Sequence, residues 1–317
     1  MADVLNKIST LTELDDVQIE KALLNRLLPR LRAYQDGQKS ILKKNTGTQI
    51  EWTRFEALAD STTEATEGVT PEAEALDPTP ITATVKQYVR GIKLTDRLLA
   101  RGKHKCRAEA VRLLSEAGAK TIDSLVVAEM LKATKVYFGN NKAAATIAAA
   151  ETVKESDIEK MFVYLADNNV PRFEDDTYHA LVTPKMASDI RKLSSFVDKA
   201  KYQDPKGETL VKGEIGTVLG IKFIESTNIP TAKHGASGSL VDCEQLIAYG
   251  PDAYGVVDVE DEGSRGKPKM IHKGLGSAGT DDYADQRASE ATKFEFAAKI
   301  LDEKRICVLK APASITL

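Results

Sequence analysis

The 317-residue chain is 42% hydrophobic and 29% charged, which is typical of a folded protein with one elaborate domain or two ordinary ones. A formal net charge of −3 excludes a uniformly cationic protein that binds nucleic acid with its whole surface. The three cysteines, Cys106, Cys243 and Cys307, lie far apart in the sequence, so we expect reduced thiols and no disulfide. The longest apolar run, residues 143–150, is too short to cross a bilayer, and we expect no membrane partner.

Residues 1–46 are predicted to form an N-terminal arm rather than a domain. They contain one narrow helical stripe of apolar residues, which Pro29 ends, and too little apolar surface for a core of their own. Between residues 21 and 46 the charged side chains are basic except for Asp36: Lys21, Arg26, Arg30, Arg32, Lys39, Lys43 and Lys44. The arm is therefore locally cationic.

Residues 47–96 predict a long antiparallel hairpin. Apolar residues alternate from Ile50 and Trp52 in the first strand, and at Ile81, Ala83 and Val85 in the second. The tip between them is rich in Thr, Pro and Glu and has almost nothing to bury, so it cannot pack as a core element by itself.

Charge alternates in blocks around this hairpin. Between residues 51 and 77 the acids greatly outnumber the single Arg54, whereas residues 86–105 are basic apart from Asp96. A solvated face explains any one run of charge most simply. Adjacent blocks of opposite sign favour a second interpretation, in which the acidic loop docks on a neighbouring copy of the chain.

Residues 106–136 contain no proline and predict one uninterrupted helix. Its apolar stripe repeats at helical spacing through Ala110, Leu114, Ala117, Thr121, Leu125 and Ala128. Arg112, Glu116, Lys120 and Asp123 fall on the opposite face, which turns apolar after Asp123. A helix of this length is expected to act as a spine across which other elements lie.

The remaining chain alternates short strands and helices. Thr183 and Pro184 are expected to begin a helix directly after the strand HALVT, so the middle of the chain is predicted to be mixed α/β. Residues 292–300 alternate as a strand, and we expect them to form a C-terminal hairpin with residues 305–311.

Catalytic patterns are weak or missing in the sequence. The four histidines have no metal-ligand spacing, and no phosphate-binding GxxxxGK[ST] loop or GxSxG elbow occurs. GLGSAG at residues 274–279 matches a dinucleotide-binding pattern, but TDDYADQRAS follows it in place of an apolar helix. The acids between Asp258 and Glu262 lack the spacing of a calcium loop, so a solvated turn is expected. No catalytic residue, cofactor or metal is predicted.

Several segments, in their order along the chain, carry a family resemblance. They are LLSEAGAKTIDSL (113–125), LVTPKMASDIRKL (181–193), GEIGTVLGIKFIESTNIP (213–230) and KFEFAAKIL (293–301). From about residue 20 to the end, the chain resembles the major capsid proteins of tailed bacteriophages, which share the Hong Kong 97-type fold. It is most similar to the capsid family typified by N-four-like podophages.

The resemblance implies an α+β fold with defined parts. Residues 1–46 would be the N-terminal arm and 47–96 the extended E-loop. A peripheral domain would comprise residues 97–138 plus 281–317, with the spine helix at 106–136, and an axial domain would comprise 139–280.

The function implied is that of a self-assembling subunit, which forms pentamers and hexamers of an icosahedral shell around double-stranded DNA. The virion capsid would be its location, after assembly in the bacterial host cytoplasm. Expected partners are further copies of the chain, a separate scaffolding protein, a portal, a decoration protein and the DNA, which it would contact non-specifically.

Three sets of residues are predicted to make these contacts. The E-loop acids are Glu64, Glu67, Glu72 and Glu74, and the basic acceptor surface on the adjacent subunit is Arg90, Lys93, Arg97 and Arg101. Arg26, Arg30 and Arg32 are the expected contacts of the arm with DNA or scaffold. Two alternatives stay open: an encapsulin-like nanocompartment that holds cargo enzymes, and a nucleotide-dependent enzyme that uses the glycine loop at 274–279.

Overall fold

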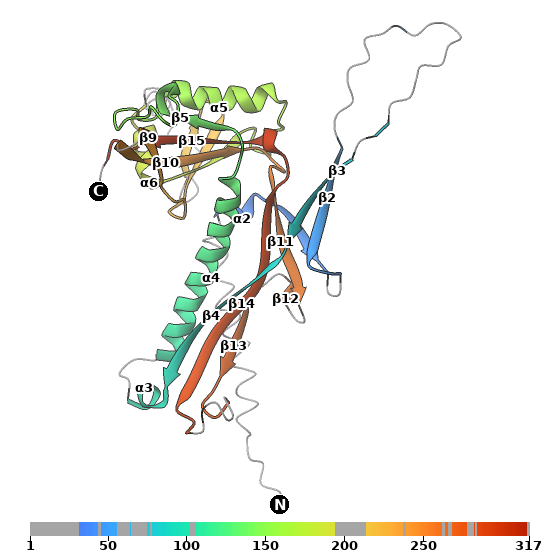
Figure 1. The fold of residues 1–317 in the computed structure, drawn as a ribbon, viewed down its shortest axis with the longest axis vertical. Coiled ribbons are helices and arrows are strands. Elements are labelled where there is room, and N and C mark those ends of the chain that lie inside the picture. Colours follow the sequence, from blue (N-terminus) through green and yellow to red (C-terminus); the bar gives the residue numbers. More distant parts are fainter. Residues whose placement is uncertain are drawn as a thin grey trace, which may run out of the picture.

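The computed structural model describes residues 32–43, 46–55, 64, 75–76, 78–101, 106–193, 214–236, 239–261, 264–265, 268–277, 282 and 284–315. The predicted arm helix, Arg26, Arg30, Glu67, Glu72 and Glu74 lie outside these ranges. In the described part, two sheets lie at different levels along one long helix, and a two-stranded hairpin projects to the side (Figure 1). The fold is a mixture of helices and strands, as expected.

A six-stranded sheet is organised around β14 (Arg287–Ile300). β14 pairs antiparallel with β4 along one edge and with β13 and β11 along the other, and β1 adds to β11 in parallel. The other strands are β1 (Gln38–Leu42), β4 (Lys86–Thr95), β11 (Tyr254–Asp261), β12 (Ser264–Arg265) and β13 (Lys269–Lys273). Successive side chains of β14 point to opposite faces, and those at even positions are mostly buried beneath the long helix.

A seven-stranded sheet contains the rest of the core. Its order is β5-β15-β10-β6-β8-β7, with β9 paired to β10. The strands are β5 (Val136–Phe138), β6 (Tyr178–Val182), β7 (Glu214–Val218), β8 (Ile221–Glu225), β9 (Ala232–Ala236), β10 (Ser239–Tyr249) and β15 (Ile306–Pro312). Every residue of β10 from Cys243 onward is buried, because both faces of the sheet are covered there.

The two faces of β10 contact different elements. Leu246 and Ala248 pack with α5 (Glu155–Asp167) and α6 (Pro184–Ile190), whereas Ile247 and Tyr249 pack in the core that continues under the long helix. α6 begins at Pro184 after Thr183, as predicted. Tyr249 therefore lies where the two sheets meet.

The long helix is α4 (Cys106–Met130), and it packs on β14, β4 and the short α2 (Arg32–Gln35). The predicted end at residue 136 is wrong, because long-range contacts take over after Met130. The Thr134 N–H donates to Glu303 Oε2 at 3.0 Å, and the Lys135 carbonyl accepts from the Val308 N–H at 3.0 Å. Val136 then enters the ladder beside β15.

The buried face of α4 is also rotated relative to the predicted stripe. Ser115 and Ala119 are buried, whereas Ala117 and Leu125 of the stripe are only partly buried and Ala128 is exposed. Asp123, predicted to be solvated, is fully buried. Its carboxylate accepts a hydrogen bond from the Ala33 N–H at 2.9 Å, which fastens α2 to the helix, and another from the Asn228 Nδ2–H at 2.6 Å, which fastens the segment after β8.

The prediction of a C-terminal hairpin is also wrong. β14 and β15 are separated by the 3₁₀ turn Glu303–Arg305, yet they belong to different sheets. The Leu301 N–H donates to the Ala253 carbonyl, and the Gly250 N–H donates to the Arg305 carbonyl, so the chain crosses between the sheets at this point. β15 then pairs with β10 and β5.

The sheets divide the chain differently from the expected domains. β11, β12 and β13 fall in the range 139–280 but belong with β14 and α4, and β15 falls in 281–317 but belongs with β10. β4 was expected in the E-loop and is a strand of the six-stranded sheet. The hairpin itself consists of β2 (Gln49–Phe55) and β3 (Pro78–Thr84), with the predicted alternation of inward and outward residues.

Candidate assembly surfaces

The base of the hairpin is anchored on the six-stranded sheet by Trp52. The indole Nε1–H donates to Ser40 Oγ at 2.9 Å, and the ring lies so close to Gly255 that a Cβ there would be 2.8 Å from Trp52 Cζ2. Trp52 also packs against a small buried cluster that contains Val257 and Ala297. These contacts fix the place from which the hairpin leaves the sheet.

The hairpin sits on the face of the sheet that points away from α4. Val257 and Ala297 are direct cross-strand partners and therefore share one face. Their neighbours Val256 and Phe296 point to the other face and belong to the core beneath α4. We call the side that carries the odd-numbered residues of β14 the hairpin face.

The acidic residues of the predicted E-loop lie beyond the two anchored strands. Glu64 is exposed, and Glu67, Glu72 and Glu74 are outside the described residues. Phe55 and Leu76, near the ends of β2 and β3, expose 58% and 69% of their surface. Both are large apolar residues left open in the isolated subunit.

The predicted basic acceptor surface is split between different places. Arg90 and Lys93 are both exposed on β4, but their odd spacing in a strand puts them on opposite faces. Arg90 is the cross-strand partner of Thr292, a buried residue beneath α4, whereas Lys93 is the partner of Ser289 on the hairpin face. Arg97 and Arg101 are exposed on α3 (Asp96–Arg101), next to the end of β4.

The hairpin face carries a group of lysines that sequence reasoning missed, apart from Lys93. Lys269 and Lys273 on β13 and Lys293 on β14 lie on the same face as Lys93, as their pairing with β14 requires. No ion pair involves any of these four side chains within the described residues. We call Lys93, Lys269, Lys273 and Lys293 the lysine platform.

The layout of the lysine platform suits an extended acidic chain. Lys269 and Lys293 are direct cross-strand partners, an arrangement that is unfavourable for a strand pair unless an anion lies nearby. The next row toward Lys273 holds the small or apolar residues Ile271, Ala291 and Gly91. The result is a strip of small and apolar residues bordered by ammonium groups. In the sequence, the sign of this shared face was that Lys269 and Lys273 are an even number of residues apart in one strand.

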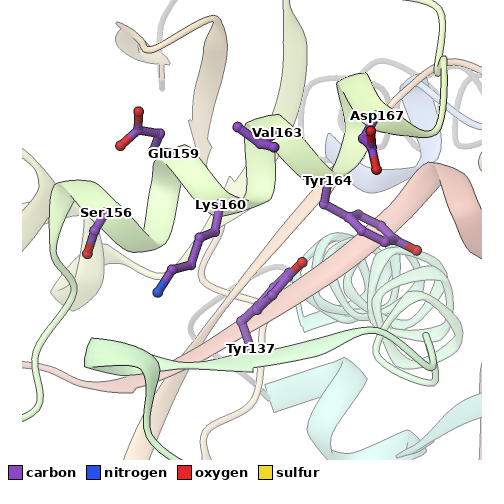
Figure 2. A pocket seen from close by; sticks show the side chains of 7 residues that line it. All are labelled: Tyr137, Ser156, Glu159, Lys160, Val163, Tyr164 and Asp167. Carbon is purple, nitrogen blue, oxygen red and sulfur yellow. The ribbon is translucent and has the colours of Figure 1, made fainter.

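A separate groove of about 460 Å³ lies between α5 and β5 on the seven-stranded sheet (Figure 2). Tyr137 and Tyr164 meet edge to face with ring centroids 6.3 Å apart, and Lys135 Nζ lies 5.1 Å and 5.3 Å from the two centroids. Burial raises the pKa of both tyrosines. In Figure 2, Lys160 and Tyr164 leave α5 on the side that faces β5 and extend to either side of Tyr137. An open aromatic groove with a cation suits contact with another protein surface.

The glycine loop has no dinucleotide-binding context. Gly274–Ser277 form a turn directly after β13, in which the Ser277 hydroxyl donates to the Gly274 carbonyl at 2.6 Å. β13 pairs antiparallel with β14, the next strand, and the described residues between them include no α-helix. The parallel strand–helix unit that presents pyrophosphate to a helix N-terminus is therefore not what these residues build.

Other candidate sites can be placed in the fold. Asp258, expected in a solvated turn, lies in β11, where the Tyr34 hydroxyl donates to its carboxylate and burial raises its pKa. Among the residues that the structure describes, no group of three or more His, Cys, Asp or Glu side chains is placed to hold a metal ion. No helix in the same part of the chain is both long and apolar enough to cross a membrane. All three cysteines are free thiols.

Comparison with solved structures finds the same fold in capsid shells. The capsid of Ralstonia phage GP4 matches with a TM-score of 0.70 at 14% identity, over 90% of this chain and 92% of that one. The cyanophage Pam1 capsid matches with a TM-score of 0.69 at 12% identity, over 92% and 93% of the two chains. The capsid of cyanophage P-SCSP1u matches with a TM-score of 0.62 at 16% identity, over 89% and 88%.

Comparison by sequence gives the family. No curated protein matches the chain. The family model described as phage capsid protein matches residues 78–307, a range that runs from β3 through α4 and both sheets to the start of β15. With this match over most of its length, the chain belongs to the phage capsid protein family and is a shell-forming major capsid protein.

Proposed function

We propose that copies of this chain form pentamers and hexamers of an icosahedral shell around double-stranded DNA, in which the acidic segment of one copy lies on the lysine platform of the next. The observation that carries this proposal is the position of the hairpin. Trp52 anchors it on the same sheet face that bears four lysines without an ion-pair partner among the described residues.

Shell geometry links these two features. Neighbours in a ring are related by rotation about an axis that runs through the shell wall, and such a rotation keeps each subunit face on the same side of the wall. The proposal places the six-stranded sheet in the plane of the wall, and in that orientation a hairpin that leaves from the hairpin face reaches the hairpin face of its neighbour. Lys93 remains in the acceptor set, whereas Arg90, on the α4 side, is removed from it.

Charge gives direction to this contact rather than most of its strength. Glu64, Glu67, Glu72 and Glu74 are the proposed acids, and Arg97 and Arg101 extend the basic surface beyond Lys93. Exposed ion pairs contribute at most ~1 kcal/mol each. Burial of apolar residues such as Phe55 and Leu76, repeated in every copy, would supply the rest of the binding free energy.

A charge exchange tests the proposal. A variant with the four loop acids changed to Lys, and another with Lys93, Lys269, Lys273 and Lys293 changed to Glu, should each fail to form closed particles in negative-stain images. The variant that carries both sets of changes should recover particles, because the signs are again opposite. Normal particles from either single set would contradict the proposed contact.

Arg90→Glu is the matched control. Arg90 is exposed on the same strand as Lys93 but faces the α4 side, so its reversal should leave assembly unchanged. Circular dichroism and thermal unfolding of each variant separate an assembly defect from a folding defect. If Arg90→Glu blocks assembly and the lysine changes do not, the predicted acceptor surface lies on the α4 side.

We assign the six-stranded sheet with α4 to the peripheral domain and the seven-stranded sheet with α5 and α6 to the axial domain. This division follows strand pairing rather than continuous ranges of sequence. Negative-stain images of rings, with each subunit's termini labelled, would check it. The axial assignment requires α5 to lie nearer the ring centre than α3.

The basic arm is proposed to contact DNA or a separate scaffolding protein through Arg26, Arg30 and Arg32. Arg32 begins α2 near the buried Asp123 and is partly exposed. Deletion of residues 1–31 preserves α2 and should lower the genome content or fidelity of the particles. Particles with a normal portal and genome after this deletion would contradict a role of the arm in contacting DNA or scaffold. Particles filled with protein in place of DNA would favour an encapsulin-like compartment.

A further inference from the structure

His179, on β6, lies between two carboxylates from different parts of the chain. Its Nδ1 is 2.7 Å from Asp36 Oδ2, and its Nε2 is 3.3 Å from Asp175 Oδ2. The Phe173 ring stacks on the imidazole with centroids 3.9 Å apart. The His179 side chain is only 12% exposed, and its contact with Asp36 is partly buried, whereas its contact with Asp175 is more open to water.

Asp36 belongs to a strap that joins the two sheets. The strap consists of residues 32–42, which form α2 and β1. Its two ends are fixed to the six-stranded sheet and to α4, because β1 pairs with β11, while Ala33 donates to Asp123 of α4 and accepts from the Tyr254 hydroxyl of β11. The middle is fixed to the seven-stranded sheet through Asp36, which lies against His179 of β6 and accepts from the Tyr249 hydroxyl of β10.

The number of protons on His179 decides how many of these contacts can form. A neutral imidazole has one N–H, so it can donate to one carboxylate and must turn a lone pair toward the other. A doubly protonated imidazole donates to Asp36 and Asp175 together. The two carboxylates also differ in their other hydrogen-bond donors. Asp175 accepts from the Lys222 ammonium at 3.2 Å and from the Thr177 hydroxyl at 2.7 Å.

Asp36 has fewer other donors. The Tyr249 hydroxyl donates to Asp36 Oδ2 at 2.9 Å, and burial raises the pKa of that hydroxyl, so it stays protonated. Loss of a proton from His179 leaves one N–H, which the shorter distance gives to Asp36, so Nε2 turns a lone pair toward Asp175. Asp175 keeps its bonds to Lys222 and Thr177, whereas the bond to Asp36, which crosses between the sheets, changes from a charge-assisted to a weaker neutral hydrogen bond.

We propose that Asp36, His179 and Asp175 form a proton-dependent latch, which fixes the strap to the seven-stranded sheet when the imidazole is charged and loosens it when the imidazole is neutral. The latch sets the relative orientation of the two sheets within one subunit. It is independent of the proposed contact between the acidic loop and the lysine platform, because none of its residues belongs to either surface.

The direction of the pH effect follows from the surroundings of His179. Burial lowers the pKa of His179, but the hydrogen bonds and charges of Asp36 and Asp175 outweigh burial, so the pKa is raised above 6.5. Asp175 stays ionised, with a pKa of about 2, because its bonds to Thr177, His179 and Lys222 outweigh burial. The contribution of the latch is complete below about pH 6.5 and is lost as the pH rises through the raised value.

Hydrogen exchange on the full chain tests this latch between about pH 6 and about pH 9. After correction for the intrinsic pH dependence of exchange, protection of the strap amides at 34–37, around Asp36, should fall as the pH rises in the wild type. Each unit by which the His179 pKa is raised corresponds to about a tenfold change in protection. His179→Gln should show low strap protection at all of these pH values.

His272→Gln is the control. His272 is the other largely buried histidine that contacts a carboxylate, Glu290, but it lies on β13, which pairs with β14 and not with the strap. Its variant should keep the wild-type pH dependence. Equal pH dependence in His179→Gln and the wild type would overturn the latch.

Asp36→Asn provides a second test that does not remove the imidazole. It keeps an oxygen for the Tyr249 hydroxyl but takes away one of the two charges that face His179. The midpoint of strap loosening, and the titration of the His179 ring followed by NMR, should both move to lower pH. A His179 titration that stays in place in Asp36→Asn would contradict the proposal even if His179→Gln cannot fold.

Discussion

Arg107, in the first turn of α4, donates from Nε to Glu290 Oε1 of β14 at 2.8 Å. Glu290 is 1% exposed and sits on the face of β14 beneath the helix. His272 Nδ1, from β13, lies 2.6 Å from the same Glu290 oxygen. One buried carboxylate thus joins the start of the long helix to two strands of the six-stranded sheet.

Arg107→Ala is expected to destabilise the subunit by about 2 kcal/mol, because it leaves a buried carboxylate with one fewer charged partner. Thermal or denaturant unfolding of the full chain would measure this loss. Arg112→Ala is the control on the same helix. Arg112 contacts Glu109 and Glu116 at the surface, so its removal should change stability little, and an equal loss in both variants would contradict the role of burial.

Local patterns predicted much of this architecture. The alternation around Trp52 and Ala83 located the hairpin strands, since period-two burial depends only on neighbouring residues. The run without proline located α4, because helical periodicity is likewise a property of neighbouring residues. The end of α4 could not be predicted from local preference, because the residues after Met130 continue the helical periodicity. They leave the helix because of contacts with the distant residues Glu303 and Val308.

The assembly surface could be predicted only in part. The alternation of side chains along β4 is enough to place Arg90 and Lys93 on opposite faces, but grouping the cations by sequence block overlooked it. Alternation within single strands cannot show that Lys269 and Lys293 are neighbours, because that depends on the register between β13 and β14. The supposed C-terminal hairpin failed for a similar reason, since closeness in sequence is outweighed by the pairing of β15 with β10.

Gly118→Ala is expected to stabilise the protein by about 0.5–1 kcal/mol, because alanine restricts the unfolded chain and favours the helix. Gly118 lies inside α4, and a Cβ built there meets no atom within 4 Å. The gain would be measured as a higher denaturant midpoint with an unchanged slope. Destabilisation would mean that the space beside Gly118 is filled in solution, for example by ordered water.

Gly139→Ala should have the opposite sign. A Cβ at Gly139 would lie 2.3 Å from the Glu151 carbonyl oxygen and 2.8 Å from the Ala311 Cβ, and a backbone oxygen cannot give way as a flexible side chain would. We expect a loss of about 1–3 kcal/mol in the same unfolding assay. Gly118→Ala serves as the matched comparison, and an identical response of the two variants would contradict the packing around Gly139.

Asp123→Ala should release α2 before the rest of the fold. The variant leaves the Ala33 N–H without its acceptor in a buried position, at an expected cost of about 1–3 kcal/mol. Hydrogen exchange should show the largest change at residues 33–35. Asp123→Asn keeps one carbonyl oxygen for the Ala33 N–H and should be milder. A uniform loss of protection across α4, with no excess at α2, would contradict the fastening role.

Thiol labelling should distinguish the three cysteines of the folded subunit. Cys106 is partly exposed at the start of α4, whereas Cys243 and Cys307 are buried in the seven-stranded sheet. Burial also raises the pKa of Cys243 and of Cys307, and only the thiolate reacts with iodoacetamide. Mass spectrometry after brief labelling should therefore find the modification at Cys106 alone, and at all three sites only after unfolding in denaturant. Early modification of Cys307 in the native protein would contradict the covered position of β15, because its side chain lies in the core beneath α5 and cannot be reached until that core opens.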